Sequence, residues 1–123
     1  MAMRVLVVED DLDSLELMSY LFRAFGHDVI GASRGDIALR LAAESHPNLI
    51  LCDLRLPGMD GFELMRQFKS LPGLGSVPVV AVTAYAMPGD RERVIGAGFD
   101  GYVSKPIDPK TFVREAEQIS AQN

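Results

Sequence analysis

Residues 3–11 decide the fold, and they read Met3-Arg4-Val5-Leu6-Val7-Val8-Glu9-Asp10-Asp11. A continuous, largely β-branched apolar run of this length is typical of a parallel strand that is buried on both faces. The run stops at three acidic residues, and from Leu12 to Phe25 the apolar residues recur at three- and four-residue steps. This change of period predicts a strand followed by an amphipathic helix, which Gly26 ends.

The same alternation of strand and helix occurs five times along the chain. Strands are expected at residues 3–8, 28–32, 48–53, 77–82 and 101–103. Helices are expected from Leu12 to Gly26, through 37–42 and ending before Pro47, from a cap at Asp60 through Phe68, over 90–95, and from Asp108-Pro109 through Ile119. Such an alternation predicts right-handed strand–helix–strand units. The expected class is α/β, a doubly wound, flavodoxin-like (βα)5 three-layer sandwich with a parallel sheet in the strand order 2-1-3-4-5.

The composition indicates one globular domain over residues 1–123, because 48% of the residues are hydrophobic and 24% are charged. A single cysteine excludes a disulfide framework and a four-thiolate metal site. The net charge of −5 disfavours nucleic acid and anionic membranes as partners. No apolar run is long enough to span a bilayer, and the first residues do not resemble a secretion signal, so a cytoplasmic location is expected.

Polar side chains gather where the expected strands end. Glu9 and Asp10 follow the first strand, Asp53 ends the third, Thr83 follows the fourth, and Lys105 follows the fifth. In the expected strand order these carboxyl ends are neighbours, so the side chains converge on one edge of the sheet. Carboxylates packed together need a compensating charge at neutral pH, and an open all-oxygen site suits Mg²⁺ better than Zn²⁺. The case is strongest for Asp53, since an unpaired carboxylate beside a dry core would be costly.

Other polar residues have simpler expected roles. Asp11 and Asp13 lie in the first turn of the first helix, where acids favour the helix dipole, and are interpreted as capping residues. His27 and His46 fall in turns at the opposite edge of the sheet and are expected to lie at the surface. Cys52 is interpreted as a small, inward-facing apolar residue and not as a nucleophile.

Four stretches of the chain, in this order and spacing, resemble one protein family. They are Val7-Val8-Glu9-Asp10, Leu51-Cys52-Asp53-Leu54-Arg55-Leu56-Pro57-Gly58-Met59-Asp60-Gly61, Thr83-Ala84 and Lys105-Pro106. Together they resemble the receiver domains of response regulators in two-component phosphorelays, and the resemblance covers essentially the whole chain. Each stretch alone would be moderate evidence, whereas the four together are specific.

The resemblance implies a role for each matched position. Asp53 would accept a phosphoryl group from a histidine kinase or a histidine phosphotransfer protein. The expected Mg²⁺ ligands are Glu9, Asp10, Asp53 and the backbone carbonyl of Arg55, while Thr83 and Lys105 would contact the phosphoryl group. Lys105-Pro106 would form the family's cis peptide bond. The domain would catalyse its own phosphorylation and dephosphorylation, and it would act as a switch more than as an enzyme.

The resemblance also implies an output switch. Tyr102 matches the family's switch aromatic, and Ala84 is small enough to admit an aromatic side chain when Thr83 moves toward a phosphoryl oxygen. The expected output surface consists of the fourth helix, the fifth strand and the last helix, and a downstream protein would bind there.

Two further surface features are expected near the site. Leu12 and Ser14, in the first turn of the first helix, would dock the helical histidine donor. Arg55 and Tyr85 each lie two positions after a site residue, so they would sit at the mouth of the site and hinder the water that removes the phosphoryl group.

Other functions fit the same fold less well. A haloacid-dehalogenase-type phosphohydrolase also uses a strand-end Asp with Mg²⁺, but its D-x-D motif would need an acid where Arg55 stands. A flavodoxin needs a hydroxyl- and glycine-rich loop where residues 9–11 would repel the FMN phosphate. A receiver-like adaptor without phosphorylation stays possible on this fold. A DNA-binding regulator is not expected, because no further domain follows the last helix. The pathway, the cognate kinase, the oligomeric state and membership of a longer protein stay open.

Overall fold

The computed structural model describes residues 2–84 and 87–122. Its elements in chain order are β1 (Arg4–Val8), α1 (Leu12–Ala24), β2 (Asp28–Ala32), α2 (Gly35–Ser45), β3 (Leu49–Cys52), β4 (Arg55–Leu56), β5 (Met59–Asp60), α3 (Gly61–Ser70), β6 (Val79–Thr83), α4 (Asp90–Gly96), β7 (Gly101–Ser104) and α5 (Phe112–Ala121).

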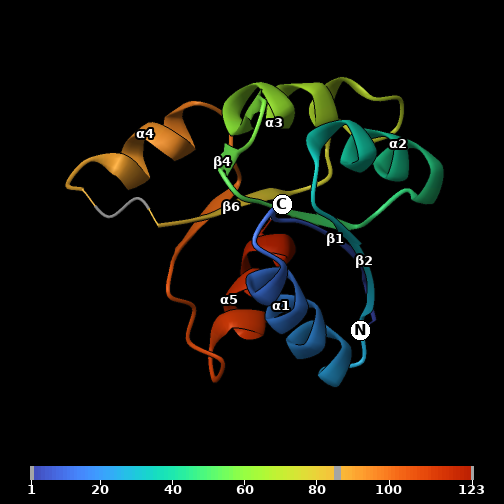
Figure 1. Ribbon diagram of the computed structural model, residues 1–123, viewed down its shortest axis with the longest axis vertical. Helices are drawn as coiled ribbons and strands as arrows, with labels where there is room; N and C mark the ends of the chain where they lie inside the picture. Colours follow the sequence, from blue (N-terminus) through green and yellow to red (C-terminus); the bar gives the residue numbers. More distant parts are fainter. Residues whose placement is uncertain (1, 85–86, 123) are drawn as a thin grey trace.

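One parallel sheet forms the centre of the molecule, with the strand order β2-β1-β3-β6-β7. This is the expected order 2-1-3-4-5, with β4 and β5 set aside as a separate short hairpin. The helices α1 and α5 cover one face of the sheet, and α2, α3 and α4 cover the other (Figure 1). The doubly wound, three-layer prediction is therefore confirmed.

Alternate side chains of the strands form two cores, one on each face of the sheet. Toward α1 and α5, Val5, Val7, Leu49 and Leu51 pack with a group that includes Phe22 and Phe112. Toward the other helices, Leu6, Val8, Ile50 and Cys52 pack with a group that includes Phe68. These strand residues are buried on both faces of the sheet, so all of them are apolar. Continuous apolar runs of this kind are typical of parallel strands between two helical layers.

The stretch between β3 and α3 is more ordered than the sequence suggests. Arg55 pairs with Asp60, and Leu56 with Met59, in an antiparallel hairpin whose turn is Pro57-Gly58. Gly58 has φ 75°, the left-handed conformation that a turn of this kind requires. The sequence predicts no strand in this stretch, because two-residue strands have no periodicity to detect.

The last helix begins later than predicted. The Asp108-Pro109 start is wrong, because α5 begins at Phe112 and Thr111 is its N-cap. Asp108 belongs to a preceding turn, in which its carboxylate accepts a hydrogen bond from the Lys110 amide (2.9 Å). Its carbonyl oxygen accepts from the Thr111 amide (3.1 Å) and leads the chain into the helix.

The prediction for His27 is also wrong. His46 is exposed as expected, whereas His27 is buried. Its Nδ1 accepts a hydrogen bond from the Met3 amide (3.0 Å), and its Nε2 lies 2.7 Å from Oε2 of Glu117 in α5. The ring therefore joins the start of the sheet to the last helix, a contact between residues 90 positions apart that the local sequence does not reveal.

Phe25 departs from the expected inward stripe of α1. It lies just past the end of the helix and is 47% exposed, while Met18, Leu21 and Phe22 are buried as predicted. Among the described residues, none of the helices is long and apolar enough to cross a bilayer.

Candidate functional site

Four neighbouring strands bring the polar residues of the sequence analysis to one edge of the sheet. Thr83 is the last residue of β6, while Glu9 and Asp53 directly follow β1 and β3. Main-chain bonds hold these ends in register, from the Asp53 amide to the Val8 carbonyl (3.1 Å) and from the Lys105 amide to the Thr83 carbonyl (2.8 Å). The convergence follows from the topology, because parallel strands all end at the same edge.

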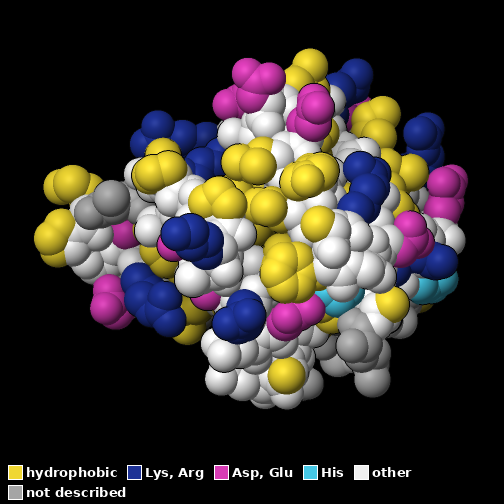
Figure 2. Space-filling model, turned by 90° about the horizontal axis from the view of Figure 1, so that it is seen from below, with side chains coloured by type: hydrophobic (Ala, Val, Ile, Leu, Met, Phe, Trp, Pro, Cys, Tyr) yellow, Lys and Arg dark blue, Asp and Glu magenta, His cyan; other side chains and the backbone are white. Residues whose placement is uncertain are grey.

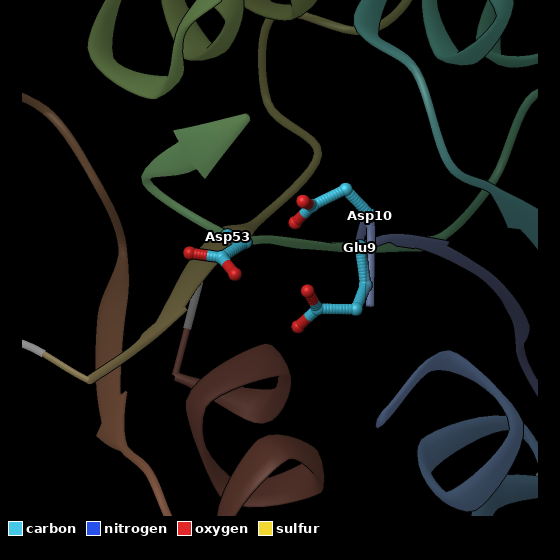
Figure 3. A group of neighbouring side chains, drawn as sticks. All are labelled: Glu9, Asp10 and Asp53. Carbon is cyan, nitrogen blue, oxygen red and sulfur yellow. The ribbon is translucent and has the colours of Figure 1, made fainter. Parts of the chain in front are cut away.

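Three carboxylates form the centre of the site. Each of Glu9, Asp10 and Asp53 contributes an oxygen, and these oxygens lie within 4.8 Å of one another. Figure 3 shows Glu9 and Asp10 extending from the end of β1 toward the side of Asp53. Glu9 and Asp53 are buried, with 1% and 6% exposed, whereas Asp10 is exposed. The cluster is thus anchored in the core and open to solvent on one side.

Lys105 supplies the positive charge for the two buried acids. Its Nζ donates hydrogen bonds to Oε1 of Glu9 and to Oδ2 of Asp53, the second at 3.0 Å. The Lys105-Pro106 peptide bond is cis, as predicted. The lysine side chain is 21% exposed, so its ammonium group is partly withdrawn from water between the two carboxylates.

Main-chain amides complete the hydrogen bonding of both acids. The amide of Asp11 donates to Oε2 of Glu9 (3.1 Å), and the amide of Arg55 donates to Oδ1 of Asp53 (2.9 Å). Asp11 also caps α1, since its side chain accepts from the Asp13 amide (3.1 Å), which confirms the capping interpretation. These amide contacts could not be predicted from the sequence, because every residue except proline carries the same donor.

Burial and the neighbouring charges shift the protonation of Glu9 and Lys105 in this site. Burial, together with the nearby Asp53 charge, raises the pKa of Glu9 from 4.5 to about 7, although its bonds to Lys105 and the Asp11 amide oppose the rise. Burial works against the charge of Lys105, but the bonds to Glu9 and Asp53 outweigh it and raise the pKa of this lysine. Near neutral pH the buried glutamate is therefore poised between its two protonation states.

The donor set fits Mg²⁺. Three carboxylates converge, one of them is exposed, and hard oxygen ligands of this kind suit a small divalent cation.

The residues expected to form the switch lie at the end of β6 and on the neighbouring strand β7. Thr83 is fully buried and Ala84 is exposed. Tyr102 is half-buried and packs against the core on the α2–α3–α4 side. Burial raises the pKa of Tyr102, and the Asp90 carboxylate at the start of α4 adds to the rise. Tyr85 lies outside the described residues, so its place at the mouth of the site stays a prediction.

Cys52 has the structural role that was expected. It is fully buried in the core, and burial raises the pKa of its thiol far above the ordinary value. The thiol therefore stays protonated and is not a nucleophile.

The chain is similar to known proteins in both sequence and structure. The family model "Response regulator receiver domain" matches residues 5–117. The polar-differentiation response regulator DivK of Brucella ovis is 42% identical over 113 residues, which are 92% of each chain.

Two solved structures share the fold. The receiver domain of the sensor histidine kinase PA1611 from Pseudomonas aeruginosa, which has a magnesium ion coordinated in its active-site cleft, matches with a TM-score of 0.86 and 30% identity over 98% of this chain and 99% of that one. The chemotaxis response regulator CheY4 of Vibrio cholerae matches with a TM-score of 0.89 over 97% of this chain and 99% of that one, and at 24% identity this likeness concerns the fold alone. The matched family model, the DivK similarity and the shared fold show that the chain belongs to the response regulator receiver domains of two-component signalling.

Proposed function

We propose that this domain, over residues 1–123, is a phosphorelay receiver that accepts a phosphoryl group on Asp53 with the help of Mg²⁺. The donor is a histidine kinase or a histidine phosphotransfer protein. The phosphorylated domain then either changes a surface that a downstream protein binds or passes the phosphoryl group on.

The observation that carries this proposal is the pairing of Asp53 with Lys105 inside an acidic cluster. Lys105 lies 3.0 Å from Oδ2 of Asp53, and the Arg55 amide lies 2.9 Å from Oδ1. The acceptor carboxylate is thus held between two donors, while Glu9 and Asp10 lie close by. A family relative holds a magnesium ion in its active-site cleft, which supports the same metal here.

Each residue has a distinct task in the proposed reaction. A carboxylate oxygen of Asp53 forms a bond to phosphorus, the bond from phosphorus to the donor nitrogen breaks, and the imidazole keeps that electron pair. Glu9, Asp10, Asp53 and the Arg55 carbonyl would hold Mg²⁺, which neutralises negative charge on the phosphoryl oxygens. Lys105, which follows β7, stabilises the same negative charge, and the Thr83 hydroxyl donates to a phosphoryl oxygen. Because all these groups belong to the receiver, it would catalyse both its phosphorylation and its dephosphorylation.

The proposal is tested with a small phosphodonor that needs no kinase. We expect the domain to gain the mass of one phosphoryl group when incubated with acetyl phosphate and Mg²⁺, and to gain none when EDTA removes the metal. Asp10→Asn is expected to weaken Mg²⁺ binding at least about tenfold, because it removes a ligand charge without disturbing the core. Intact-protein mass spectrometry and titration calorimetry measure the two effects. Labelling that proceeds equally in EDTA would refute the role of the metal.

The surface beside the site suits a helical donor. A cavity of about 360 Å³ lies between α1 and the chain after β7, and its lining includes Leu17, Met18, Lys105 and Ile107. Hydrophobic side chains gather in the middle of the face that Figure 2 shows, which is the α1 and α5 side of the molecule. Leu12 at the start of α1 is 67% exposed, as expected of a docking residue.

We expect Leu12→Asp to slow phosphoryl transfer from the cognate histidine donor about tenfold while leaving labelling by acetyl phosphate unchanged. A charged side chain in an apolar contact weakens docking of the histidine donor, and a tenfold loss of affinity corresponds to about 1.4 kcal/mol. Acetyl phosphate needs no such contact, so its reaction should not change. Phe25→Asp, an exposed residue at the far end of α1, is the matched control. Equal losses with both phosphodonors would mean that Leu12 supports the fold instead.

The switch is proposed to act through Thr83, Ala84 and Tyr102. Thr83 and Ser104 are register partners, as are Ala81 and Tyr102, so a movement at the end of β6 acts directly on β7. Tyr102 is half-buried, and in the proposed switch it moves further inward. The surface formed by α4, β7 and α5 would then change for a downstream protein, through a shift between two states that both exist before phosphorylation.

We expect beryllium fluoride with Mg²⁺ to shift the NMR signals of Thr83, Ala84 and Tyr102 and of the α4 backbone. Beryllium fluoride stands in for the phosphoryl group on Asp53, so Asp53→Asn serves as the control and should show none of these shifts. Changes confined to the neighbourhood of Asp53, with Tyr102 and α4 unmoved, would show that the domain relays its phosphoryl group without altering this surface.

A further inference from the structure

The helix that follows the acceptor begins with a residue that has no room for a side chain. A Cβ atom on Gly61 would lie 2.6 Å from the Cα of Leu54 and 2.9 Å from the carbonyl oxygens of Asp53 and Leu54. All three are main-chain atoms, so they cannot rotate away as the end of a flexible side chain can. The first turn of α3 therefore rests directly on the peptide that follows Asp53, and only glycine permits this contact.

The segment from Leu54 to Gly61 forms one unit, which is closed by a hydrogen bond and anchored in the core. The Gly61 amide donates to the Leu54 carbonyl (3.3 Å), directly behind the β4–β5 hairpin. Asp60 caps α3 through the Phe62 amide (3.0 Å), which fixes the exit of the hairpin. Leu54 and Leu56 are buried in the core, so the hairpin is held on its inner side as well.

This unit also donates a hydrogen bond to the carboxylate of Asp53. Arg55 is the first residue of the hairpin, and its amide donates to Oδ1 of Asp53 at 2.9 Å. We propose that Gly61 is a positioning residue for the acceptor, because its contact with Leu54 determines the position of the Arg55 peptide. The amide of that peptide orients the Asp53 carboxylate, and its carbonyl is a proposed Mg²⁺ ligand. The inference rests on the proposed function for its effect on phosphorylation, but its geometric part does not.

The direct test is Gly61→Ala in the whole domain. A methyl group at 2.6 Å from Leu54 Cα forces the two backbones apart, so the Arg55 amide should lose part of its bond to Asp53. We expect a displaced Arg55 amide signal and faster hydrogen exchange there in the metal-free domain. We expect Mg²⁺ binding by calorimetry to weaken about tenfold, the scale on which residues behind metal ligands act.

Gly101→Ala is the matched control. A Cβ on Gly101 would lie 2.5 Å from Cδ1 of Ile119, so this variant also creates a clash, but between β7 and α5. It should lower the unfolding midpoint without changing the Arg55 amide or the affinity for Mg²⁺. If Gly61→Ala keeps the parental Arg55 signal and Mg²⁺ affinity, or changes them no more than Gly101→Ala does, the positioning role is refuted.

A second pair of variants decides the question if Gly61→Ala does not fold. Leu56→Ala loosens the inner anchor of the hairpin, and Leu74→Ala removes another buried leucine from the same core but outside this unit. Only Leu56→Ala should weaken Mg²⁺ binding and shift the Arg55 amide, whereas equal effects of both variants would overturn the inference.

Different measurements reveal a failure of this inference and a failure of the proposed function. If the parental domain neither binds Mg²⁺ nor accepts a phosphoryl group, the proposed function fails. The Arg55 amide in the metal-free variants still decides whether Gly61 positions the Asp53 carboxylate. A displaced amide supports that role, and an unmoved amide refutes it.

Discussion

Asp53→Asn is expected to abolish the phosphoryl mass gain from acetyl phosphate completely, while the domain stays folded. The side-chain amide has nearly the shape of the carboxylate, and its single oxygen can still accept one of the two bonds that Asp53 receives from Lys105 and the Arg55 amide. It lacks the anionic oxygen that would attack phosphorus. The variant also removes one of three neighbouring negative charges, so its unfolding midpoint should be no lower than that of the parent.

The control for this prediction is Asp60→Asn in the same loop. Asp60 is exposed and caps α3, and asparagine is as good a capping residue as aspartate. Asp60→Asn should therefore be phosphorylated like the parent. Continued labelling of Asp53→Asn at the parental rate would show that the phosphoryl group goes to another residue and would reject the assignment.

Lys105→Met is expected to lower the free energy of unfolding of the metal-free domain at pH 8 by about 2 kcal/mol. Removal of one partner from a buried ion pair costs up to about 3–5 kcal/mol, and the partial exposure of Lys105 reduces that figure. The two acids it serves, Glu9 and Asp53, would keep only their main-chain donors.

The loss should depend on pH in a defined direction. The pKa of Glu9 in the folded domain, about 7, lies above its ordinary value of 4.5. A carboxyl group with a raised pKa contributes stability that is fully present below about pH 4.5 and is lost as the pH rises through 7. The difference between Lys105→Met and the parent should therefore be largest at pH 8 and smaller at pH 5, where Glu9 is protonated and the main loss is the bond from Lys105 to Asp53.

Urea unfolding in EDTA at pH 5 and pH 8 measures this difference. Lys110→Met, which removes an exposed lysine near the start of α5, is the control and should have little effect at either pH. A Lys105→Met domain that is as stable as the parent at pH 8 would show that the ion pairs of Lys105 do not stabilise the fold. An equal loss at both pH values would contradict the role of Glu9.

Much of the fold could be predicted because it is encoded in short-range patterns. The apolar run before Glu9 and the three- and four-residue steps after Leu12 distinguish strand from helix without any tertiary information. Five such alternations leave few possible topologies, since strand–helix–strand connections are right-handed. The meeting of Glu9, Asp53 and Lys105 at one edge was predictable for the same reason, because the carboxyl ends of parallel strands lie together.

What the tertiary structure alone decided are contacts between distant residues and contacts made by the main chain. Lys105 bonds to Glu9 across 96 positions, and His27 bonds to Glu117 across 90, so neither pairing leaves a local pattern in the sequence. Which side chains reach the site follows from the order of strands and polar residues along the chain. The final arrangement of these side chains depends on main-chain amides, such as that of Arg55, which nearly every residue carries. It also depends on the absence of a side chain at Gly61, because the backbones of Gly61 and Leu54 come close together only in the folded domain.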